Sequence, residues 1–515
     1  MNPVAEALRH PETYPHPVAT EIQVVETHIS WIFLTGPYAY KLKKPVDLGF
    51  LDFSTLERRR HCCLEELRLN RRLCPDLYID VLPVTASQEG YRIGAEGHIV
   101  DYVVRMVQFD RAFELDRLLR TGELTFRELD DAASIIASFH ASTPRTDPTS
   151  VFGNPEVLLK PMLENLELTG QIARSTDEMA DIETIRLWTN AEERRIEGIL
   201  RERKSGGMVR ECHGDMHTGN MVIWHGKIMI FDCIEFNPEL SVIDVMSDAA
   251  FLFMDLDHSG RPGLAWHFLN AYLSRSGDYA GLRVLRFYST YRAMVRAKVT
   301  SIRLTQESDE DRKIEILEEH RSYLKLALDY TRPGEPMLLV THGLSGSGKS
   351  HLSSRLADRG GFAHIRSDVE RKRLFGIESY ERSALKGLDI YSPEATHKTY
   401  ETMLDAATAA VAGGCTIIVD ATFLKKSQRS LFTRLAAGMN CRCRILCFQA
   451  PPEVLRARVL ARHEEGRDAS EADIDVLAAQ MRSDEPPDGD EKALCIEIDT
   501  QGEVDLEALI EALSR

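Results

Sequence analysis

The sequence predicts a multidomain α/β protein, in which a two-lobed α+β region precedes a domain with a parallel sheet flanked by helices. Three observations support this prediction. The chain has 515 residues, which is more than one hydrophobic core normally serves. Residues 331–336, with two prolines and a glycine, separate a charged helical run from an apolar strand. Strand-like segments dominate the first hundred residues, and helical segments dominate from about residue 113.

The expected elements follow the hydrophobic periodicity along the chain. We expect strands at residues 22–27, 30–34, 38–44, 100–106, 227–231, 337–342, 364–368, 416–420 and 441–448. We expect helices at residues 55–73, 309–330, 350–358 and 455–462. The expected domain limits are residues 1–109 for the N-lobe, 110–330 for the helical C-lobe, 331–336 for a linker, and 337–515 for the second domain.

Composition and charge limit the class of protein. The chain is 43% hydrophobic and 28% charged, which is ordinary for a globular protein. Its first residues lack a basic region followed by an apolar run, and no window approaches ~18 apolar residues. We therefore expect a cytoplasmic protein with no membrane partner. A net charge of −17 disfavours a long nucleic-acid groove, while a nucleic-acid end in a local basic pocket remains an alternative.

The ten cysteines are scattered and could indicate a metal site. Cys441, Cys443 and Cys447 fall on one face of the strand expected at residues 441–448. No second cysteine pair lies at the spacing of a zinc finger. Buried strand thiols are therefore the favoured interpretation, with zinc as the alternative.

A glycine-rich segment between a predicted strand and a predicted helix indicates phosphate binding. Residues 343–350 read Gly-Leu-Ser-Gly-Ser-Gly-Lys-Ser, which fits the pattern G-x-x-x-x-G-K-[ST]. The backbone N–H groups of such a loop surround phosphates, and the following helix adds its positive N-terminal end. Lys349 would contact the β- and γ-phosphates, and Ser350 would ligate magnesium. We expect nucleotide contacts from Gly343, Gly346, Ser347, Gly348, Lys349 and Ser350.

An earlier motif predicts phosphoryl transfer to a hydroxyl group. Residues 213–220 read His-Gly-Asp-Met-His-Thr-Gly-Asn, and Phe-Asp ends the strand that follows. Such a transfer needs a carboxylate that accepts the hydroxyl proton and ligands for magnesium. Asp215 and Asn220 have the five-residue spacing of a kinase catalytic loop, and Asp232 lies where a second magnesium ligand belongs. The alternative is an ordinary polar cluster.

This stretch resembles the aminoglycoside phosphotransferase family, which includes choline- and sugar-kinase relatives. The resemblance covers about residues 20–330 and implies a two-lobed, protein-kinase-like fold that uses ATP and Mg²⁺. It implies that Asp215 is the catalytic base and that Asn220 and Asp232 are the magnesium ligands. It also implies that Asp244 or Asp248 braces the catalytic loop. A nucleotide-binding relic without activity is the alternative.

The same resemblance places a nucleotide-clamping lysine on the third strand. Lys41 is the expected residue, and Lys43 points to the same face. Glu66 on the next helix would be its ion-pair partner, with Glu65 as the alternative. Adenine would lie against residues 106–109. No G-x-G-x-x-G loop precedes these residues.

Residues 337–482 resemble the small P-loop kinases, among them polynucleotide 5′-hydroxyl kinases, zeta-toxin-like sugar-nucleotide kinases and gluconate-kinase-type enzymes. The resemblance rests on Ser-Asp-x-x-Arg after one strand, a carboxylate that ends a second strand, and arginines on a later helix. It implies that Asp368 is the general base and that Arg371 binds the substrate. Asp420 would support magnesium, and Arg458 and Arg462 would close over the transferring phosphate. A helix cap at Asp368 and a solvated arginine face are the alternatives.

The whole chain thus resembles a bacterial fusion of an aminoglycoside-phosphotransferase-like domain with a P-loop kinase-like ATPase of the AAA type. The resemblance implies a bifunctional kinase that transfers the γ-phosphate of ATP to small hydroxylated metabolites, one site per module. Two alternatives stay open. The P-loop half could act on a nucleic-acid 5′-hydroxyl, or the N-terminal module could be a ligand sensor that regulates the P-loop ATPase.

Overall fold

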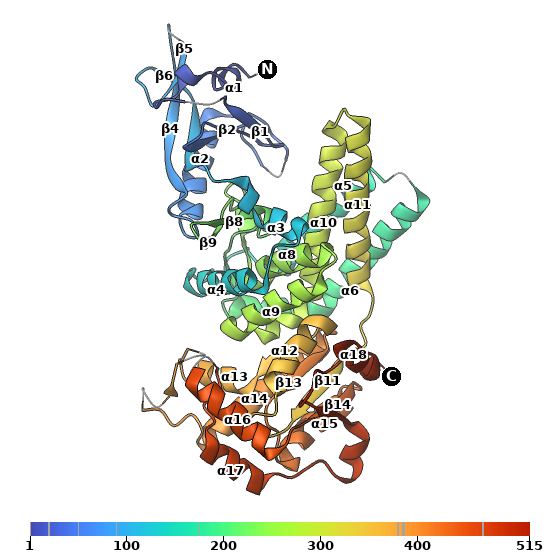
Figure 1. Ribbon diagram of the computed structural model, residues 1–515. Coiled ribbons are helices and arrows are strands. Elements are labelled where there is room, and N and C mark those ends of the chain that lie inside the picture. The colour runs from blue at the N-terminus through green and yellow to red at the C-terminus, as the bar shows by residue number, and fades with distance from the viewer. Residues whose placement is uncertain are drawn as a thin grey trace. The chain divides into compact units, whose positions relative to one another are not determined.

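The computed structural model describes residues 2–18, 21–49, 51–88, 90–173, 175–378, 381–383, 387–465 and 468–514. It contains two compact units (Figure 1). The first consists of Met1–Glu128, Ser138–Asp255 and Tyr291–Lys325. The second consists of Leu129–Ala137, Leu256–Thr290 and Leu326–Arg515. None of the described helices combines the length and the apolar character needed to cross a membrane.

The first unit begins with an antiparallel sheet in the order β1-β2-β3-β6-β4-β5. Its strands are β1 (Gln23–Glu26), β2 (Ser30–Leu34), β3 (Tyr38–Lys43), β4 (Tyr78–Ser87), β5 (Gly90–Ile93) and β6 (His98–Val107). Helix α2 (Leu56–Asn70) packs against β6 and β4. Thr55 caps this helix by accepting the N–H of Arg58. The strands and the helix that the periodicity predicted in this region are confirmed, with ends shifted by one to three residues.

Helices form most of the remainder of the first unit. Its longer helices are α3 (Leu115–Thr121), α4 (Phe126–Ser142), α5 (Pro155–Gly170), α6 (Thr176–Ser205), α8 (Val245–His258), α10 (Leu282–Gln306) and α11 (Glu310–Thr331), of which α4, α8, α10 and α11 continue into the second unit. Two short ribbons carry the expected catalytic loop. One pairs β7 (Val209–Glu211) with β10 (Val242–Asp244), and the other pairs β8 (Met221–Trp224) with β9 (Lys227–Ile230).

The second unit is built on a five-stranded, all-parallel sheet in the order β12-β13-β11-β14-β15. The strands are β11 (Met337–His342), β12 (Ala363–Arg366), β13 (Ile417–Asp420), β14 (Arg442–Gln449) and β15 (Cys495–Asp499). The helices are α12 (Lys349–Gly360), α13 (Ser367–Leu374), α14 (Pro393–Ala412), α15 (Lys426–Gly438), α16 (Pro452–Glu465), α17 (Ile474–Ser483) and α18 (Leu506–Ser514). Every residue of β11 and β13 is buried, as expected of a parallel sheet with helices on its faces. The predicted fold class is confirmed.

The second unit also contains residues that precede the breaker cluster. Helix α9 (Pro262–Ser276) and the short helix η4 (Tyr279–Gly281) belong to it, because α9 packs against α12 and β12 and η4 packs against α14. The expected linker at residues 331–336 begins inside α11, which ends at Thr331. The domain limits drawn from the sequence stay a prediction.

The cysteines of β14 are buried thiols rather than metal ligands. All ten cysteines are free, and Cys443 and Cys447 are buried in the sheet. Cys441 precedes β14 and is half-buried. Within the described part of the chain, the one cluster with metal-ligand spacing consists of His140, Cys212 and Asp248, which lies elsewhere. Among the described residues, the cysteines of residues 441–448 therefore do not form part of a group with the spacing of zinc ligands.

The half-buried His267 makes the stability of the second unit depend on pH. The His267 Nδ1 atom lies 3.1 Å from Asp358 Oδ2, and its Nε2 atom lies 3.4 Å from Asp130 Oδ1. Although burial opposes the charged ring, these two carboxylates raise the pKa of His267 from 6.5 to about 9. The stabilisation is therefore complete below pH 6.5 and disappears as the pH rises through about 9.

We expect His267→Gln to lower the free energy of unfolding of the second unit by up to about 3 kcal/mol below pH 6.5, and by little at pH 10. The ¹⁹F signal of 5-fluorotryptophan at Trp266 can follow this transition in urea, since the other three tryptophans lie in the first unit. A difference between wild type and variant that stays constant from pH 6 to pH 10 would contradict this account.

Candidate active sites

A buried group of charges joins β3 to α2 in the first unit. Glu66 is fully buried, and its two oxygens lie 2.8 Å from Lys41 Nζ and 2.7 Å from Lys43 Nζ. Lys41 Nζ also lies 2.5 Å from Asp232 Oδ1, and Lys43 also pairs with Glu235. Burial opposes the carboxylate, but the two lysines lower the pKa of Glu66 to about 2. Both lysines therefore share Glu66, and only Lys41 reaches Asp232.

The catalytic loop is braced by Asp248 at the start of α8. One oxygen of Asp248 accepts the N–H of His213 and the other accepts the N–H of Gly214, both at 2.9 Å. His140 Nε2 lies 3.2 Å from the same carboxylate. Burial disfavours the charge, but hydrogen bonding from His140 and nearby cations lower the pKa of Asp248 to about 2. Asp244 instead pairs with Arg203, so Asp248 is the bracing residue.

Asp215 and Asn220 are directly linked. Asn220 Nδ2 donates to the Asp215 backbone oxygen at 2.9 Å and to its Oδ2 at 3.0 Å. His217 Nε2 lies 3.4 Å from the same Oδ2. Burial raises the pKa of Asp215, but His217 and His213 more than offset this, and the net pKa is below the ordinary value. The half-buried Asp215 is therefore ionised at neutral pH.

A pocket of about 240 Å³ in the first unit is lined by three of the predicted site residues, but not by Glu66 or Asp215. Lys41, Asn220 and Asp232 line it, together with residues 106–109, where adenine was expected. Asp232 has a φ of +67°, an uncommon conformation for a residue with a side chain, and such residues cluster at active sites. The sequence-predicted residues of this unit thus lie together.

In the second unit the glycines of residues 343–350 are required by close contacts. Gly343, Gly346 and Gly348 all have positive φ. A Cβ at Gly346 would lie 2.7 Å from the Leu455 backbone oxygen, and one at Gly343 would lie 2.7 Å from that of Phe448. The loop therefore folds tightly between β11 and α12, in the strand–loop–helix context of a phosphate site.

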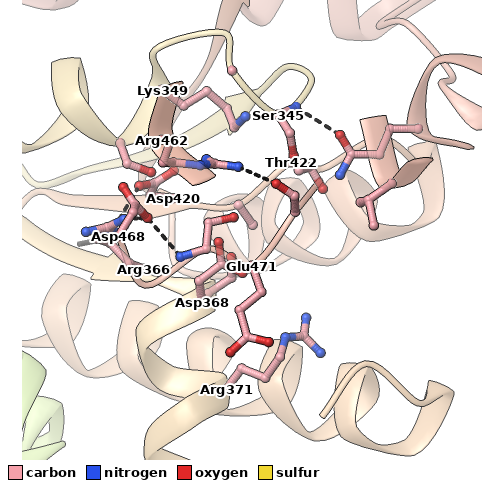
Figure 2. A pocket seen from close by; sticks show the side chains of 18 of the residues that line it. Ser345, Lys349, Arg366, Asp368, Arg371, Asp420, Thr422, Arg462, Asp468 and Glu471 are labelled. Carbon is pink, nitrogen blue, oxygen red and sulfur yellow. Dashed lines mark hydrogen bonds and ion pairs between the residues drawn. The ribbon is translucent and has the colours of Figure 1, made fainter. Parts of the chain in front are cut away.

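A pocket of about 460 Å³ opens beside this loop, and Figure 2 shows the side chains that line it. The predicted residues that line it are Gly346, Gly348, Lys349, Ser350, Asp368, Arg371, Asp420, Arg458 and Arg462. Gly343 and Ser347 belong to the loop but do not line the pocket. Lys349 Nζ donates to the Leu344 oxygen at 2.8 Å. Burial lowers the pKa of Lys349 to about 8 although Asp420 and Asp368 oppose this shift, so the ammonium group is poorly solvated and available to an anion.

Asp420 ends β13 at the floor of this pocket. His364 Nε2 lies 3.4 Å and Arg366 Nε 3.8 Å from its Oδ2. Burial disfavours the charge, but His364, Arg366 and the Ser350 hydroxyl hold its pKa below the ordinary value. The same Oδ2 is buried without a hydrogen-bond partner. A buried carboxylate oxygen that has only these longer ion-pair contacts and lies near a serine hydroxyl is suited to a hard cation.

Asp368 and Arg371 lie on one turn of α13, on the side of the pocket away from Lys349 (Figure 2). Arg371 is buried and donates to the Ile390 oxygen at 2.9 Å and to Thr396 Oγ1 at 3.1 Å. Its guanidinium also lies 5.0 Å from the centre of the Tyr391 ring. Glu471 lines the same region of the pocket. This end of the pocket therefore presents fixed groups of both charges.

The two predicted phosphate-closing arginines have different surroundings. Arg458 donates to the Gly346 oxygen, to Thr500 Oγ1 at 3.0 Å and to the Thr500 oxygen at 2.6 Å. It thereby ties the loop to the end of β15. Arg462 donates to the Ala472 oxygen at 2.9 Å, and Figure 2 shows it reaching toward the centre of the pocket. The geometry favours a positioning role for Arg458 and contact with phosphate for Arg462.

Several residues that hold these sites were not predicted from the sequence. Glu235 pairs with Lys43, and Thr500 bonds both Arg458 and the Ser347 oxygen. His364 contacts Asp420. Glu235 is the exception with a local signal, because it follows Asp232 by three residues in a segment already suspected of function.

Comparison with protein families agrees with this geometry. Residues 82–288 match the model of the phosphotransferase enzyme family, and residues 338–487 match a model described as an AAA domain. The chain carries a phosphotransferase-family domain followed by a P-loop domain of the AAA type. The first match contains the Asp215–Asp232 segment, and the second contains the 343–350 loop through Arg462. These matches support a phosphotransferase that uses ATP.

Similar proteins span both domains or one of them. Uncharacterized proteins of Mycobacterium tuberculosis and Mycobacterium bovis are each 29% identical over 473 residues, 90% of this chain and 92% of theirs. A gluconokinase from Sinorhizobium meliloti 1021 is 20% identical and covers 35% of this chain and 89% of its own, with a TM-score of 0.25. A choline/ethanolamine kinase family protein from Mesorhizobium loti is 11% identical and covers 63% and 99%, with a TM-score of 0.35.

We expect Glu66→Gln to destabilise the first unit by about 3 kcal/mol or more, because it leaves two buried ammonium groups with one fewer counter-charge. Glu65→Gln is the matched control. Glu65 pairs with Arg68 at the surface, where the loss should be about 0–1 kcal/mol. Urea denaturation followed by the fluorescence of the first unit's tryptophans measures both. Equal losses in the two variants would refute the assignment of Glu66 as the shared counter-ion.

We expect Gly346→Ala to weaken ATP binding to the second unit about tenfold or more, because the added Cβ would strain the loop by about 1–3 kcal/mol. Gly438→Ala is the control, since no atom lies within 4 Å of its Cβ position. Titration calorimetry with Mg²⁺ and a non-hydrolysable ATP analogue measures the affinities. Unchanged affinity in Gly346→Ala would show that the loop does not hold phosphate.

Proposed function

We propose that the chain is a bifunctional, ATP-dependent kinase with one phosphoryl-transfer site in each unit and small hydroxylated metabolites as acceptors. One observation carries the proposal. In each unit a single pocket gathers a buried lysine with a carboxylate and oxygen ligands for a cation. Phosphoryl transfer needs little covalent chemistry from a protein, and this set of charges is what it does need.

In the first unit Lys41 would bind the nucleotide phosphates. Its ammonium group is already oriented by Glu66 and Asp232, so little reorganisation is needed when phosphate arrives. Asp215 would accept the proton of the acceptor hydroxyl, and its lowered pKa keeps it ionised for this task. The amide nitrogen of Asn220 donates to Asp215, so its oxygen would be the atom that ligates a cation.

In the second unit Lys349 would contact the β- and γ-phosphates from within the loop. Asp368 would orient the acceptor hydroxyl and accept its proton. Arg371 would bind a polar or anionic group of the acceptor, since its side chain is held in place by Ile390 and Thr396. Arg462 would neutralise charge that develops on the transferring phosphate.

Magnesium suits both residue sets. Ser350 and Asp420 would hold it in the second unit, where the buried Asp420 Oδ2 accepts no hydrogen bond and could ligate a cation. Asn220 and Asp232 would hold it in the first, where the Asp232 side chain remains 43% exposed beside the pocket. Bound magnesium would neutralise phosphate charge and orient the nucleotide.

The net charge of the chain and the charges that line the second unit's pocket both favour a small molecule over a polymer as the phosphate acceptor. The net charge of −17 opposes a long phosphate backbone. The pocket of the second unit pairs its basic groups with acidic ones, as Arg366 Nη2 lies 3.3 Å from Asp468 Oδ1. A small polar molecule can satisfy such a mixed lining, while a nucleic-acid end would meet carboxylates as well as cations.

The test is mass spectrometry of a metabolite extract incubated with ATP and Mg²⁺. We expect Asp215→Asn to lower one product roughly 10²–10⁴-fold, as loss of a general base does. Lys349→Met should lower the product of the second unit roughly 10²–10³-fold. Asp76→Asn and Lys426→Met, both at exposed positions, are the controls. A second arm supplies a 5′-hydroxyl oligonucleotide.

The outcomes separate the alternatives. A metabolite product that one variant loses assigns its site. A labelled oligonucleotide lost only in Lys349→Met would replace metabolites with a nucleic-acid end as the acceptor of the second unit. No product in either arm would overturn the kinase proposal and favour a regulated ATPase.

We expect Arg462→Met to lower kcat of the second unit roughly 10²-fold while changing ATP affinity little, because its charge acts mainly in the transition state. Arg458→Met should instead weaken ATP binding, because Arg458 holds the loop backbone. Initial rates at varied ATP concentration separate kcat from KM. The reverse pattern would exchange the roles of the two arginines.

A further inference from the structure

The outer edge of the parallel sheet in the second unit is formed by β12. Because β12 pairs on one side only, its other side presents backbone groups that need partners. Three such groups follow from the register. Ala363 N–H bonds to the Thr416 oxygen on the inner side, so the N–H and C=O of His364 and the C=O of Phe362 face outward.

Two side chains from α9 and η4 satisfy all three groups. Asn270 Nδ2 donates to the Phe362 oxygen at 2.9 Å, and Asn270 Oδ1 accepts the N–H of His364 at 2.9 Å. The Tyr279 hydroxyl donates to the His364 oxygen at 3.2 Å. The amide of Asn270 therefore pairs with β12 as a neighbouring strand would, and the buried Tyr279 completes the edge.

The strand held in this way carries the acceptor side of the pocket. Arg366 ends β12 and α13 begins at Ser367, so Asp368 and Arg371 follow the strand without an intervening loop. The His364 side chain lies 3.4 Å from Asp420 Oδ2. The phosphate-binding loop lies instead between β11 and α12. A shift of β12 would therefore move the acceptor groups relative to a fixed loop.

Close packing holds the segment that supplies these side chains. A Cβ at Gly277, just after α9, would lie 2.4 Å from the guanidinium carbon of Arg373 on α13. A Cβ at Gly413, just after α14, would lie 2.2 Å from the Leu282 backbone oxygen. Arg373 could move aside at Gly277, but the backbone contact at Gly413 leaves no room for a methyl group, so Leu282 lies directly against the end of α14.

We propose that Asn270 and Tyr279 are positioning residues for phosphoryl transfer in the second unit, a role that rests on the proposed function of that site. They hold β12 in place, and β12 in turn fixes the separation between the phosphate-binding loop and the pair Asp368 and Arg371. Both residues lie outside residues 338–487, the stretch matched by the AAA model. The acceptor half of the P-loop site is thus completed by a segment from the part of the chain before residue 331.

The test compares Asn270→Leu and Tyr279→Phe in the full chain carrying Asp215→Asn, which removes turnover at the other site. Tyr330→Phe is the matched control, because it deletes a buried tyrosine hydroxyl that bonds Asp257 elsewhere in the same unit. Three quantities are measured: kcat for transfer from Mg²⁺-ATP to water or to an identified acceptor, the Kd of a non-hydrolysable ATP analogue, and amide hydrogen exchange across residues 363–371.

We expect kcat to fall roughly tenfold to a hundredfold in Asn270→Leu and less in Tyr279→Phe, because small misplacements of reacting groups have effects of this size. The analogue Kd should stay within about threefold, and exchange across residues 363–371 should accelerate. Tyr330→Phe should change none of these. Faster exchange with unchanged kcat, or parallel losses of kcat and analogue binding, would overturn the positioning role.

A failure of the proposed function is recognised separately. If the chain with only Asp215→Asn transfers phosphate to neither water nor any acceptor, the kinase proposal for this unit fails. In that case amide exchange and analogue binding alone test whether Asn270 and Tyr279 position β12. If amide exchange across residues 363–371 is faster in the Asn270→Leu and Tyr279→Phe variants while the analogue Kd is unchanged, the result supports the conclusion that these two side chains position β12. Unchanged exchange refutes it.

Discussion

Glu66 is the residue on which the nucleotide side of the first unit depends. A carboxylate that is fully removed from water must be paired, and Glu66 is paired twice, with Lys41 and with Lys43. These contacts fix α2 to β3. Each lysine then reaches a second carboxylate in the segment after β9, Asp232 for Lys41 and Glu235 for Lys43. The sheet, the helix and the segment after β9 are thus held by one group of opposite charges.

The second unit also buries charged groups, but they have fewer partners of opposite charge within the protein. Lys349 is buried in the loop, and its pKa of about 8 reflects an ammonium group that burial destabilises. Asp420 is buried in the same pocket, and one of its oxygens has ion-pair contacts to His364 and Arg366 but no hydrogen bond. A phosphate and a divalent cation would relieve both conditions at once. The site of the second unit is therefore arranged for ligands whose charges would neutralise Lys349 and Asp420. In the first unit the corresponding charges are already paired with one another.

Much of this arrangement follows from local sequence, and some of it does not. The loop at residues 343–350 needs glycine at defined positions, and the alternation along β3 places Lys41 and Lys43 on one face, so both features are readable. Which lysine meets Asp232 depends on the register between β3 and the segment after β9, which lie almost two hundred residues apart. The same holds for the choice of Asp248 over Asp244. The role of Thr500, and the cover of β12 by Asn270, depend on packing between distant elements that carry no local signal.

The central claim is that the chain has two nucleotide sites, and counting bound nucleotides tests it most directly. Native mass spectrometry with Mg²⁺ and a non-hydrolysable ATP analogue should show two molecules bound per chain. Lys349→Met should retain one, and Lys41→Met should retain the other. A single bound analogue on the unmodified chain, or two that survive both substitutions, would contradict the account.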